Sequence, residues 1–333
     1  MLKQFTHFLS VLLALLTSAQ ESEAHSVPAT ISLFGPLSSN GTAYDQTASS
    51  FCIGLINCAH LEIHGISAAY GYNQTKTDLT GVGIGGVGNF VGGSSYGVEF
   101  GFVTNINGGH MYGLQLSLIN VVQDHVYGAQ MGFLNFSGEN VGGLQFGAAN
   151  IILPQDEGGE FAVQFGLLNV SNQERVIPIG LLSLARGGRL SMEFSWDSVG
   201  YGRVTLLSGS RYFYTILDCD SRELNPGKRQ SYHRERPFIR SATFGAAFPI
   251  GPRTNVRLED VAYSPTWYAR DALHGYRVVG EFAPSPYFSY HAGLERLAFR
   301  EPSRRRSDSL TSKPDRFFSL TAGVSVNALG WWK

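Results

Sequence analysis

The sequence predicts an all-β protein, an antiparallel transmembrane β-barrel of roughly 16–18 strands. Three observations carry this prediction. An eight-residue phrase recurs along the first half of the chain, its side chains alternate in character, and charged residues make up only 15% of the 333 residues while glycine accounts for 40 of them. Alternation with a period of two is typical of β-strands. Few charges combined with many glycines and aromatics favour a barrel in lipid over a soluble enzyme.

The first element is an export signal. Residues 1–24 place Lys3 before the apolar stretch 8–16, and small residues at cleavage spacing follow at Ser22 and Ala24. This order is typical of a secretory signal peptide, and its apolar core is too short to span a bilayer. We therefore expect the mature chain to begin near residue 25 and to be a single β-barrel domain over residues 25–333, located in a bacterial outer membrane or at the cell surface.

The second element is the repeat array, residues 29–184. The phrase reads Gly-Leu-Gln-Leu-Ser-Leu-Ile-Asn in the copy that begins at Gly113. Consecutive copies start 15 to 19 residues apart. Their starts are Ser50, Gly65, Gly81, Gly97, Gly113, Gly128, Gly143, Ala162 and Ile177. Ten residues per strand plus a short turn match this period, so each copy is interpreted as one tilted membrane-crossing strand.

The two faces of the repeated strand differ. In the copy at Gly113, one face carries leucines, including Leu116, whereas the other carries Gly113, Gln115 and Ser117. We expect the large apolar face to meet lipid, with Leu116, Met131, Phe146 and Phe165 in one lipid-facing column. The glycine and glutamine face would then line the barrel interior.

The third element, residues 186–333, loses the repeat but keeps the alternation, and charges stay on one face of each strand. These strands are expected to close the barrel. Charges inside a barrel set ion preference, or they pair and fill the lumen. The predicted lumen-lining residues of both parts are Glu99, Gln115, Gln130, Gln145, Gln164, Arg189, Glu193, Arg211, Arg253, Arg257, Glu259, Arg277 and Glu281.

The repeats, followed by the segment 205–214, resemble bacterial surface-repeat proteins with Gly-Leu-Gln-x-Gly-Leu-Ile-Asn repeats. The resemblance covers about residues 50–217. Such proteins are mostly uncharacterised surface or outer-membrane proteins. The resemblance therefore implies a location rather than an activity, and it implies no catalytic or ligand-binding residue.

Two long basic segments, 222–240 and 300–316, interrupt the strands of the second half. Solvated loops are one interpretation. The other is contact with a polyanion such as lipid phosphate. The residues assigned to that contact are Arg234, Arg236, Arg304, Arg305 and Arg306.

The three cysteines are interpreted as small buried residues. Cys52 and Cys58 lie six residues apart on what the repeat predicts to be one strand. An extended strand would separate them by roughly 20 Å, far beyond the reach of a disulfide. With Cys219 the count is odd, so at least one thiol has no partner within the chain.

No motif predicts catalysis, a metal or a cofactor. The glycines from Gly81 onward lack the Lys-Ser/Thr of a phosphate loop and fall in register with the repeat. No Cys-x-x-Cys pair occurs in the chain, and the histidines alone do not make a metal site persuasive. Asp124 and His125, near His110, are the one catalytic alternative, and residues of these types are ordinary in turns. The chain is therefore expected to be non-enzymatic and free of cofactors.

The predicted function is that of an outer-membrane pore or surface-exposed scaffold. Its expected partners are membrane lipid, with lipopolysaccharide or small solutes as further candidates. Residues 26–185 carry ten acidic and two basic side chains, and residues 186–333 carry 22 basic and 14 acidic ones. The two halves cancel, which indicates no nucleic-acid partner.

The alternative is a secreted β-solenoid adhesin, because a near-constant period suits stacked coils. Three arguments weigh against it. The repeat is short for a coil, the second half has no period to stack, and a solenoid is expected to bury its large face.

Overall fold

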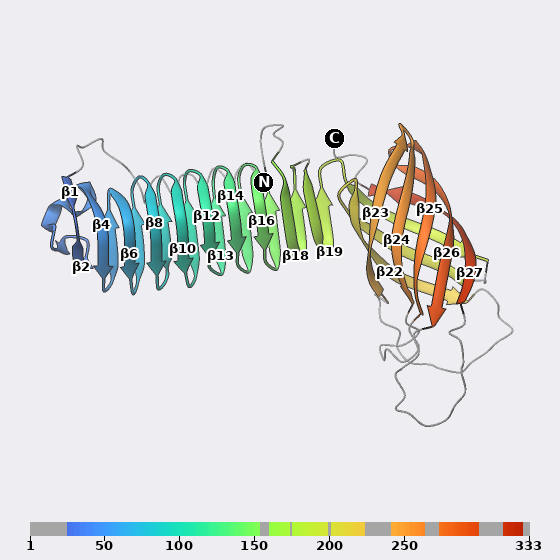
Figure 1. Ribbon diagram of the computed structural model, residues 1–333, viewed down its shortest axis with the longest axis horizontal. Coiled ribbons are helices and arrows are strands. Elements are labelled where there is room, and N and C mark those ends of the chain that lie inside the picture. Colours follow the sequence, from blue (N-terminus) through green and yellow to red (C-terminus); the bar gives the residue numbers. More distant parts are fainter. Residues whose placement is uncertain are drawn as a thin grey trace, which may run out of the picture. The chain divides into compact units, whose positions relative to one another are not determined.

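The computed structural model describes residues 25–153, 160–173, 175–198, 201–223, 241–263, 273–299 and 316–328. The chain divides into two compact units, one up to Val176 and one from Ile177 onward. Both are built of strands, and the only helical elements described are the short 3-10 helix η1 and an isolated 3-10 residue after the last strand (Figure 1). Among the described residues, no helix is long and apolar enough to cross a membrane.

The first unit is a β-solenoid. Its strands are β1 (His25–Val27), β2 (Thr30–Phe34), β3 (Leu37–Ser38), β4 (Thr47–Gly54), β5 (Asn57–His60), β6 (Glu62–Ala69), β7 (Tyr72–Thr75), β8 (Leu79–Gly85), β9 (Gly88–Val91), β10 (Ser95–Gly101), β11 (Thr104–Asn107), β12 (Met111–Leu116), β13 (Ile119–Val122), β14 (Val126–Met131), β15 (Leu134–Ser137), β16 (Val141–Phe146), β17 (Ala149–Ile152) and β18 (Ala162–Ser171). From β4 onward the strands pair in parallel with the strands one coil away, in two rows that β18 joins (Figure 1).

One repeat is one coil of two strands. In the copy at Gly113 the chain runs along β12, bends at Ser117 and Leu118, and continues as β13. Equivalent residues of successive coils lie opposite each other, as Gly113 does with Gly128. This is the physical basis of the period, since each coil must return to the same register before the next can pair with it.

The first coils are covered by a small cap. Here β2 and β3 form an antiparallel hairpin, β1 and β2 each pair in parallel with β4, and η1 (Gly41–Gln46) leads into β4. The cap therefore occupies the edge that β4 would otherwise leave unpaired, which is a common way to protect a terminal strand.

Two amide ladders fill the solenoid. Along one ladder the amide nitrogen of each glutamine donates to the preceding coil, as from Gln130 to Gln115 over 3.0 Å and from Gln145 to Gln130 over 2.8 Å. Along the other, asparagines donate toward the following coil, as from Asn120 to Asn135 over 2.9 Å. These side chains are fully buried. The ladders pair amides inside the protein, which offsets the usual cost of burying them.

The second unit contains a closed antiparallel barrel of eight strands. They are β20 (Arg189–Asp197), β21 (Tyr201–Gly209), β22 (Phe213–Glu223), β23 (Ser241–Gly251), β24 (Thr254–Tyr263), β25 (Leu273–Ser285), β26 (Phe288–Phe299) and β27 (Arg316–Asn327). Each pairs with the next, and β27 pairs back onto β20 (Figure 1). The middle of β19 (Val176–Ala185) contacts this barrel, since Thr215 donates to the carbonyl of Gly180 over 2.6 Å.

The all-β class is confirmed, but the prediction of one barrel of 16–18 antiparallel strands over residues 25–333 is wrong. The array 29–184 is mainly parallel and contributes no strand to the eight of the barrel. The error came from treating each repeat as a straight strand, whereas the bend at Ser117 and Leu118 turns it into a coil. The predicted closure by residues 186–333 does occur, within those residues alone.

Candidate functional site

The interior of the barrel holds a network of buried ion pairs. At its centre the Arg257 guanidinium lies 2.5 Å from a carboxylate oxygen of Glu193 and 3.2 Å from one of Glu259. Arg277 donates from Nε to the other oxygen of Glu259 over 2.7 Å. All four side chains are at most 2% exposed. They reach the centre from β20, β24 and β25, because each of the four falls on an inward-facing position of its alternating strand.

Neighbouring groups extend the network. The Tyr214 hydroxyl donates to Glu259 over 2.8 Å, and the Ser325 hydroxyl donates to Glu193 over 3.0 Å. A separate pair joins Arg203 to Glu295 over 3.2 Å. A buried ion pair stabilises the fold little more than apolar residues of the same volume would. Removing one partner, however, leaves an uncompensated buried charge and lowers the stability by about 3–5 kcal/mol. The charges thus pair and fill the lumen, which was one of the two outcomes expected from the sequence.

One end of the barrel opens into a cavity of about 240 Å³. Arg189 and Glu281 form an ion pair of 2.5 Å at its wall, and Asn255 and Ser289 both donate to the same Glu281 carboxylate. Arg211 also lines this cavity. Both Glu281 oxygens are therefore already engaged.

The predicted lumen residues therefore separate into three groups. Glu193, Arg257, Glu259, Arg277 and Glu281 are buried inside the barrel, with Arg189 half-buried at its mouth. Arg211 and Arg253 lie exposed in turns at the strand ends, because the alternation does not continue through a turn. The residues in the repeats line the solenoid interior instead of a barrel lumen; they are Glu99, Gln115, Gln130, Gln145 and Gln164.

Glu99 is the one charged residue among the repeat amides. It takes the glutamine position in its coil and accepts hydrogen bonds from Asn107 over 2.8 Å and from Gln115 over 3.2 Å. Complete burial raises the pKa of the Glu99 carboxyl above its ordinary value of 4.5, and these two hydrogen bonds oppose the rise only in part. Glu99 therefore ends the glutamine ladder with an acceptor-only group.

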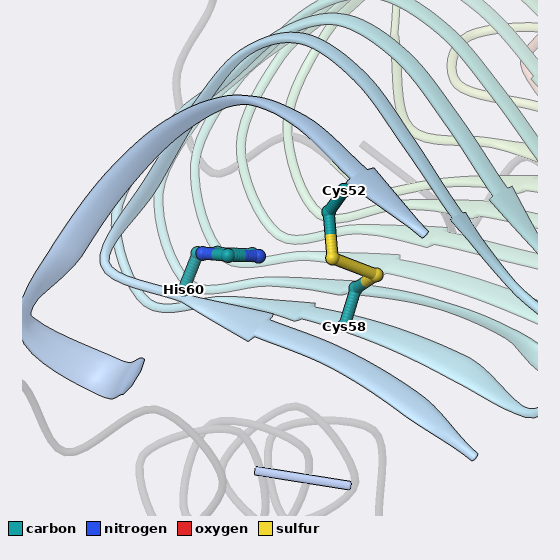
Figure 2. Close-up of side chains that lie close together, drawn as sticks. All are labelled: Cys52, Cys58 and His60. Carbon is teal, nitrogen blue, oxygen red and sulfur yellow. A yellow bond between two sulfur atoms is a disulfide. The ribbon is translucent and has the colours of Figure 1, made fainter. Parts of the chain in front are cut away.

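A site that the sequence analysis missed lies in the first full coil. Cys52 of β4 and Cys58 of β5 form a disulfide with a Cα–Cα distance of 6.2 Å. The prediction that they are too far apart is wrong, because the chain bends at Leu55 and Ile56 and brings the two strands face to face. His60 lies beside them, with its ring directed toward the sulfurs (Figure 2).

His60 is 1% exposed, and burial lowers the pKa of its ring from 6.5 to about 4. The Thr47 backbone is close enough to oppose this shift in part. Even so, neither ring nitrogen forms a hydrogen bond of normal geometry within the part of the chain described. The spacing Cys-x-x-x-x-x-Cys-x-His was visible in the sequence, but it brings the three groups together only once the bend is known.

The residues assigned to polyanion contact, Arg234, Arg236, Arg304, Arg305 and Arg306, lie outside the described residues, as does the predicted signal peptide. Comparisons of the chain with models of protein families, with curated proteins and with solved structures gave no match. The resemblance to bacterial surface-repeat proteins stays a prediction.

Proposed function

We propose that this chain is a non-enzymatic surface scaffold, in which the eight-stranded barrel is a lipid-embedded anchor and the β-solenoid is a module for contact with other macromolecules at the cell surface. The observation that carries the proposal is the barrel's inverted arrangement, with ion pairs inside and large apolar side chains outside. Soluble proteins normally show the opposite, and lipid-embedded barrels show this one.

The outer face of the barrel supports an anchor. Large apolar side chains are exposed on β20 and on β23 to β27, at positions that alternate with the buried side chains of these strands. They are Met192, Phe194, Trp196, Phe244, Phe248, Leu258, Tyr276, Val278, Phe282, Tyr290, Leu294, Phe318, Leu320 and Val326. A soluble monomer rarely exposes an apolar area of this extent. Strand closure also leaves no unpaired edge, which a bilayer requires.

The filled lumen weighs against a pore. Eight strands leave an interior that side chains can fill, whereas aqueous channels are typical of much larger barrels. Here the central space is taken by Arg257, Arg277 and their carboxylate partners. We therefore favour the scaffold over the pore, and with it the role that the sequence analysis gave to a solenoid adhesin.

The outer surface of the solenoid supports an interaction module. Exposed apolar residues recur at the bend of successive coils, with Phe102 at 70%, Leu118 at 51% and Phe133 at 67% exposure. At the other end of the strands that lead to these bends, Tyr96, Tyr112 and Tyr127 stack with ring centroids 4.9 and 4.8 Å apart. Such a regular, charge-poor surface offers the same contact once per coil, which suits multivalent binding.

A matched pair of substitutions tests the anchor. Leu258 and Leu118 are about equally exposed, at 48% and 51%, on the barrel and the solenoid respectively. We expect Leu258→Arg to impair membrane assembly by about 2–4 kcal/mol if the site lies near mid-bilayer. Leu118→Arg should leave assembly unchanged. The measurement is the fraction of protein in washed membranes that migrates differently on a denaturing gel before and after boiling. Equal behaviour of the two variants would refute the anchor.

Conductance separates the scaffold from the pore. Protein inserted into planar bilayers should show no stepwise currents, since the lumen is filled by ion pairs. Arg211 lies at the open end of the barrel. Steady single-channel currents with an ion selectivity that changes in Arg211→Glu would support the pore and overturn the scaffold assignment.

A further inference from the structure

Cys52, Cys58 and His60 form a compact donor set in the solenoid. The two sulfurs and a ring nitrogen all lie within 4.8 Å of one another, and each side chain is at most 1% exposed. Figure 2 shows the three side chains converging from two facing strands. Within the described residues, this is the one group of three such side chains close enough to share an ion.

The disulfide alone does not account for His60. A buried imidazole without hydrogen-bond partners costs folding free energy, whereas the ladder side chains, such as Gln130 and Asn120, offset that cost by bonding to the adjacent coil. His60 has no such partner among the described residues, although it points at two sulfur atoms. An orphaned ring aimed at two cysteines is the arrangement expected of a ligand whose ion is absent in the oxidised form.

The chemistry of the donors selects the ion. Two thiolates and an imidazole prefer thiophilic ions such as Zn²⁺ and Cu⁺. With Zn²⁺ the two thiolates and a neutral imidazole give a net charge of zero, whereas Cu⁺ leaves a net negative charge in a buried site. Burial of a net charge is costly, so Zn²⁺ is favoured. Zn²⁺ with two cysteines, one histidine and a fourth, exchangeable position is a known coordination pattern.

The geometry permits the change from disulfide to metal site. Tetrahedral zinc with Zn–S bonds of about 2.3 Å separates its two sulfurs by about 3.8 Å. The Cα atoms of Cys52 and Cys58 are 6.2 Å apart, so rotation of the side chains can supply that separation while the two strands stay in place.

We propose that Cys52, Cys58 and His60 form a redox-gated zinc site. In the oxidised form the disulfide closes the site. A dithiol reductant opens it by thiol–disulfide exchange, in which the reductant loses two electrons to the S–S bond, becomes a disulfide itself and transfers two protons to the cysteine sulfurs. Zn²⁺ then displaces both thiol protons, which pass to solvent, and forms bonds to the two sulfurs and one nitrogen of His60.

The test uses the full-length mature chain carrying Cys219→Ser, so that bound zinc cannot be attributed to the third cysteine. Protein is prepared in the oxidised form and after phosphine reduction without oxygen, incubated with Zn²⁺, and freed of unbound metal. We expect about one zinc per reduced chain and none per oxidised chain. With Co²⁺ in place of Zn²⁺, the reduced chain should develop sulfur-to-cobalt charge-transfer absorption.

Substitutions identify the ligands. Cys52→Ser, Cys58→Ser and His60→Ala should each weaken zinc binding by the reduced chain at least about tenfold. His64→Ala, four residues away and 53% exposed, is the matched control and should bind as the parent does. If the ligand variants do not fold, the melting temperature of the parent tests the site instead. Zinc should raise that temperature in the reduced form alone. The proposal would be overturned if the reduced parent bound no zinc, if both redox forms bound it equally, or if His60→Ala left binding unchanged. Binding of Cu⁺ but not Zn²⁺ would overturn the assignment of the ion.

Discussion

Glu99 shows how one side chain links the solenoid to pH. Its carboxyl sits where later coils have glutamine, and burial raises its pKa. The folded protein therefore binds the Glu99 proton more tightly than the unfolded chain does. The stabilisation from that proton is fully present below the unfolded value of about 4.5 and is lost as the pH rises through the folded pKa.

The first prediction follows from this upward shift of the Glu99 pKa. Glu99→Gln should increase the free energy of unfolding of the solenoid by about 1–3 kcal/mol at pH 7, because no charge is then buried. Asn107 can turn its amide to match the new donor, since its Oδ1 has no partner within the described residues. The difference between variant and parent should shrink as the pH falls toward 4. Chemical denaturation over a pH series measures it, and a difference that grows on acidification would contradict the assignment.

The second prediction compares two neighbouring residues with opposite facing. Gln115 is fully buried in its ladder, whereas Leu116 is half-exposed. Gln115→Arg should cost about 3–5 kcal/mol because it buries a charge without a partner. Leu116→Arg should cost about 1 kcal/mol or less. A lipid-facing Leu116 in a barrel would reverse this order, so the two unfolding free energies discriminate between solenoid and barrel.

At the scale of elements, a column of glycines allows the coils to stack. Gly143 has φ of +147°, and a Cβ there would lie 1.9 Å from the carbonyl oxygen of Gly128 in the preceding coil. At the adjacent Gly142, a Cβ would meet only the ends of the side chains of Glu160 and Tyr127, at 3.0 and 3.4 Å. Both the backbone angle and the close approach thus require glycine at residue 143 and not at residue 142.

The third prediction uses this adjacent pair. Gly143→Ala should lower the free energy of unfolding by about 3 kcal/mol or more, because strain at a positive φ adds to a backbone clash. Gly142→Ala should change it by less than about 1 kcal/mol. Thermal denaturation of the two variants provides the measurement. Equal stability would mean that the coils do not stack in the register described.

The facing of the strands could be predicted from the sequence, whereas the bend could not. Alternation correctly placed Gln115 inside and Leu116 outside, and it correctly placed Arg257 and Glu259 on the inner face of the barrel. Gln115 and Asn120 are five residues apart, so a straight strand would put them on opposite faces. Both are fully buried, which only a bend between them allows. That odd spacing was the available signal.

The barrel was predicted with the wrong strand number because period-two alternation is local. Alternation states which way a side chain points, but it carries no information about which strand lies beside it. The same limit applies to the site at Cys52, Cys58 and His60, where the distance between groups depends on pairing across a bend. The ion pair between Arg257 and Glu193 likewise joins two strands that are not consecutive in the chain, β24 and β20.

At the scale of the whole molecule, each unit has its own internal source of stability. The solenoid depends on amide ladders and stacked coils, and the barrel depends on eight paired strands around an ion-pair network. The first is a nearly one-dimensional array in which each coil contacts its neighbours, so a local defect weakens the stack. The second is a closed ring in which removing one charge leaves its partner buried and unpaired.

The fourth prediction is that these two sources are thermodynamically separable. Calorimetry of the purified chain in detergent should show two unfolding transitions. Gly143→Ala should lower the melting temperature of one by several degrees and leave the other in place, and Glu193→Gln should do the reverse, because substitutions in separate packed networks act independently. The double variant should then show both shifts, each within error of its single-variant value. If either single substitution moves both transitions, the two units share a cooperative network, and the assignment of anchor and interaction module to separate units would have to be abandoned.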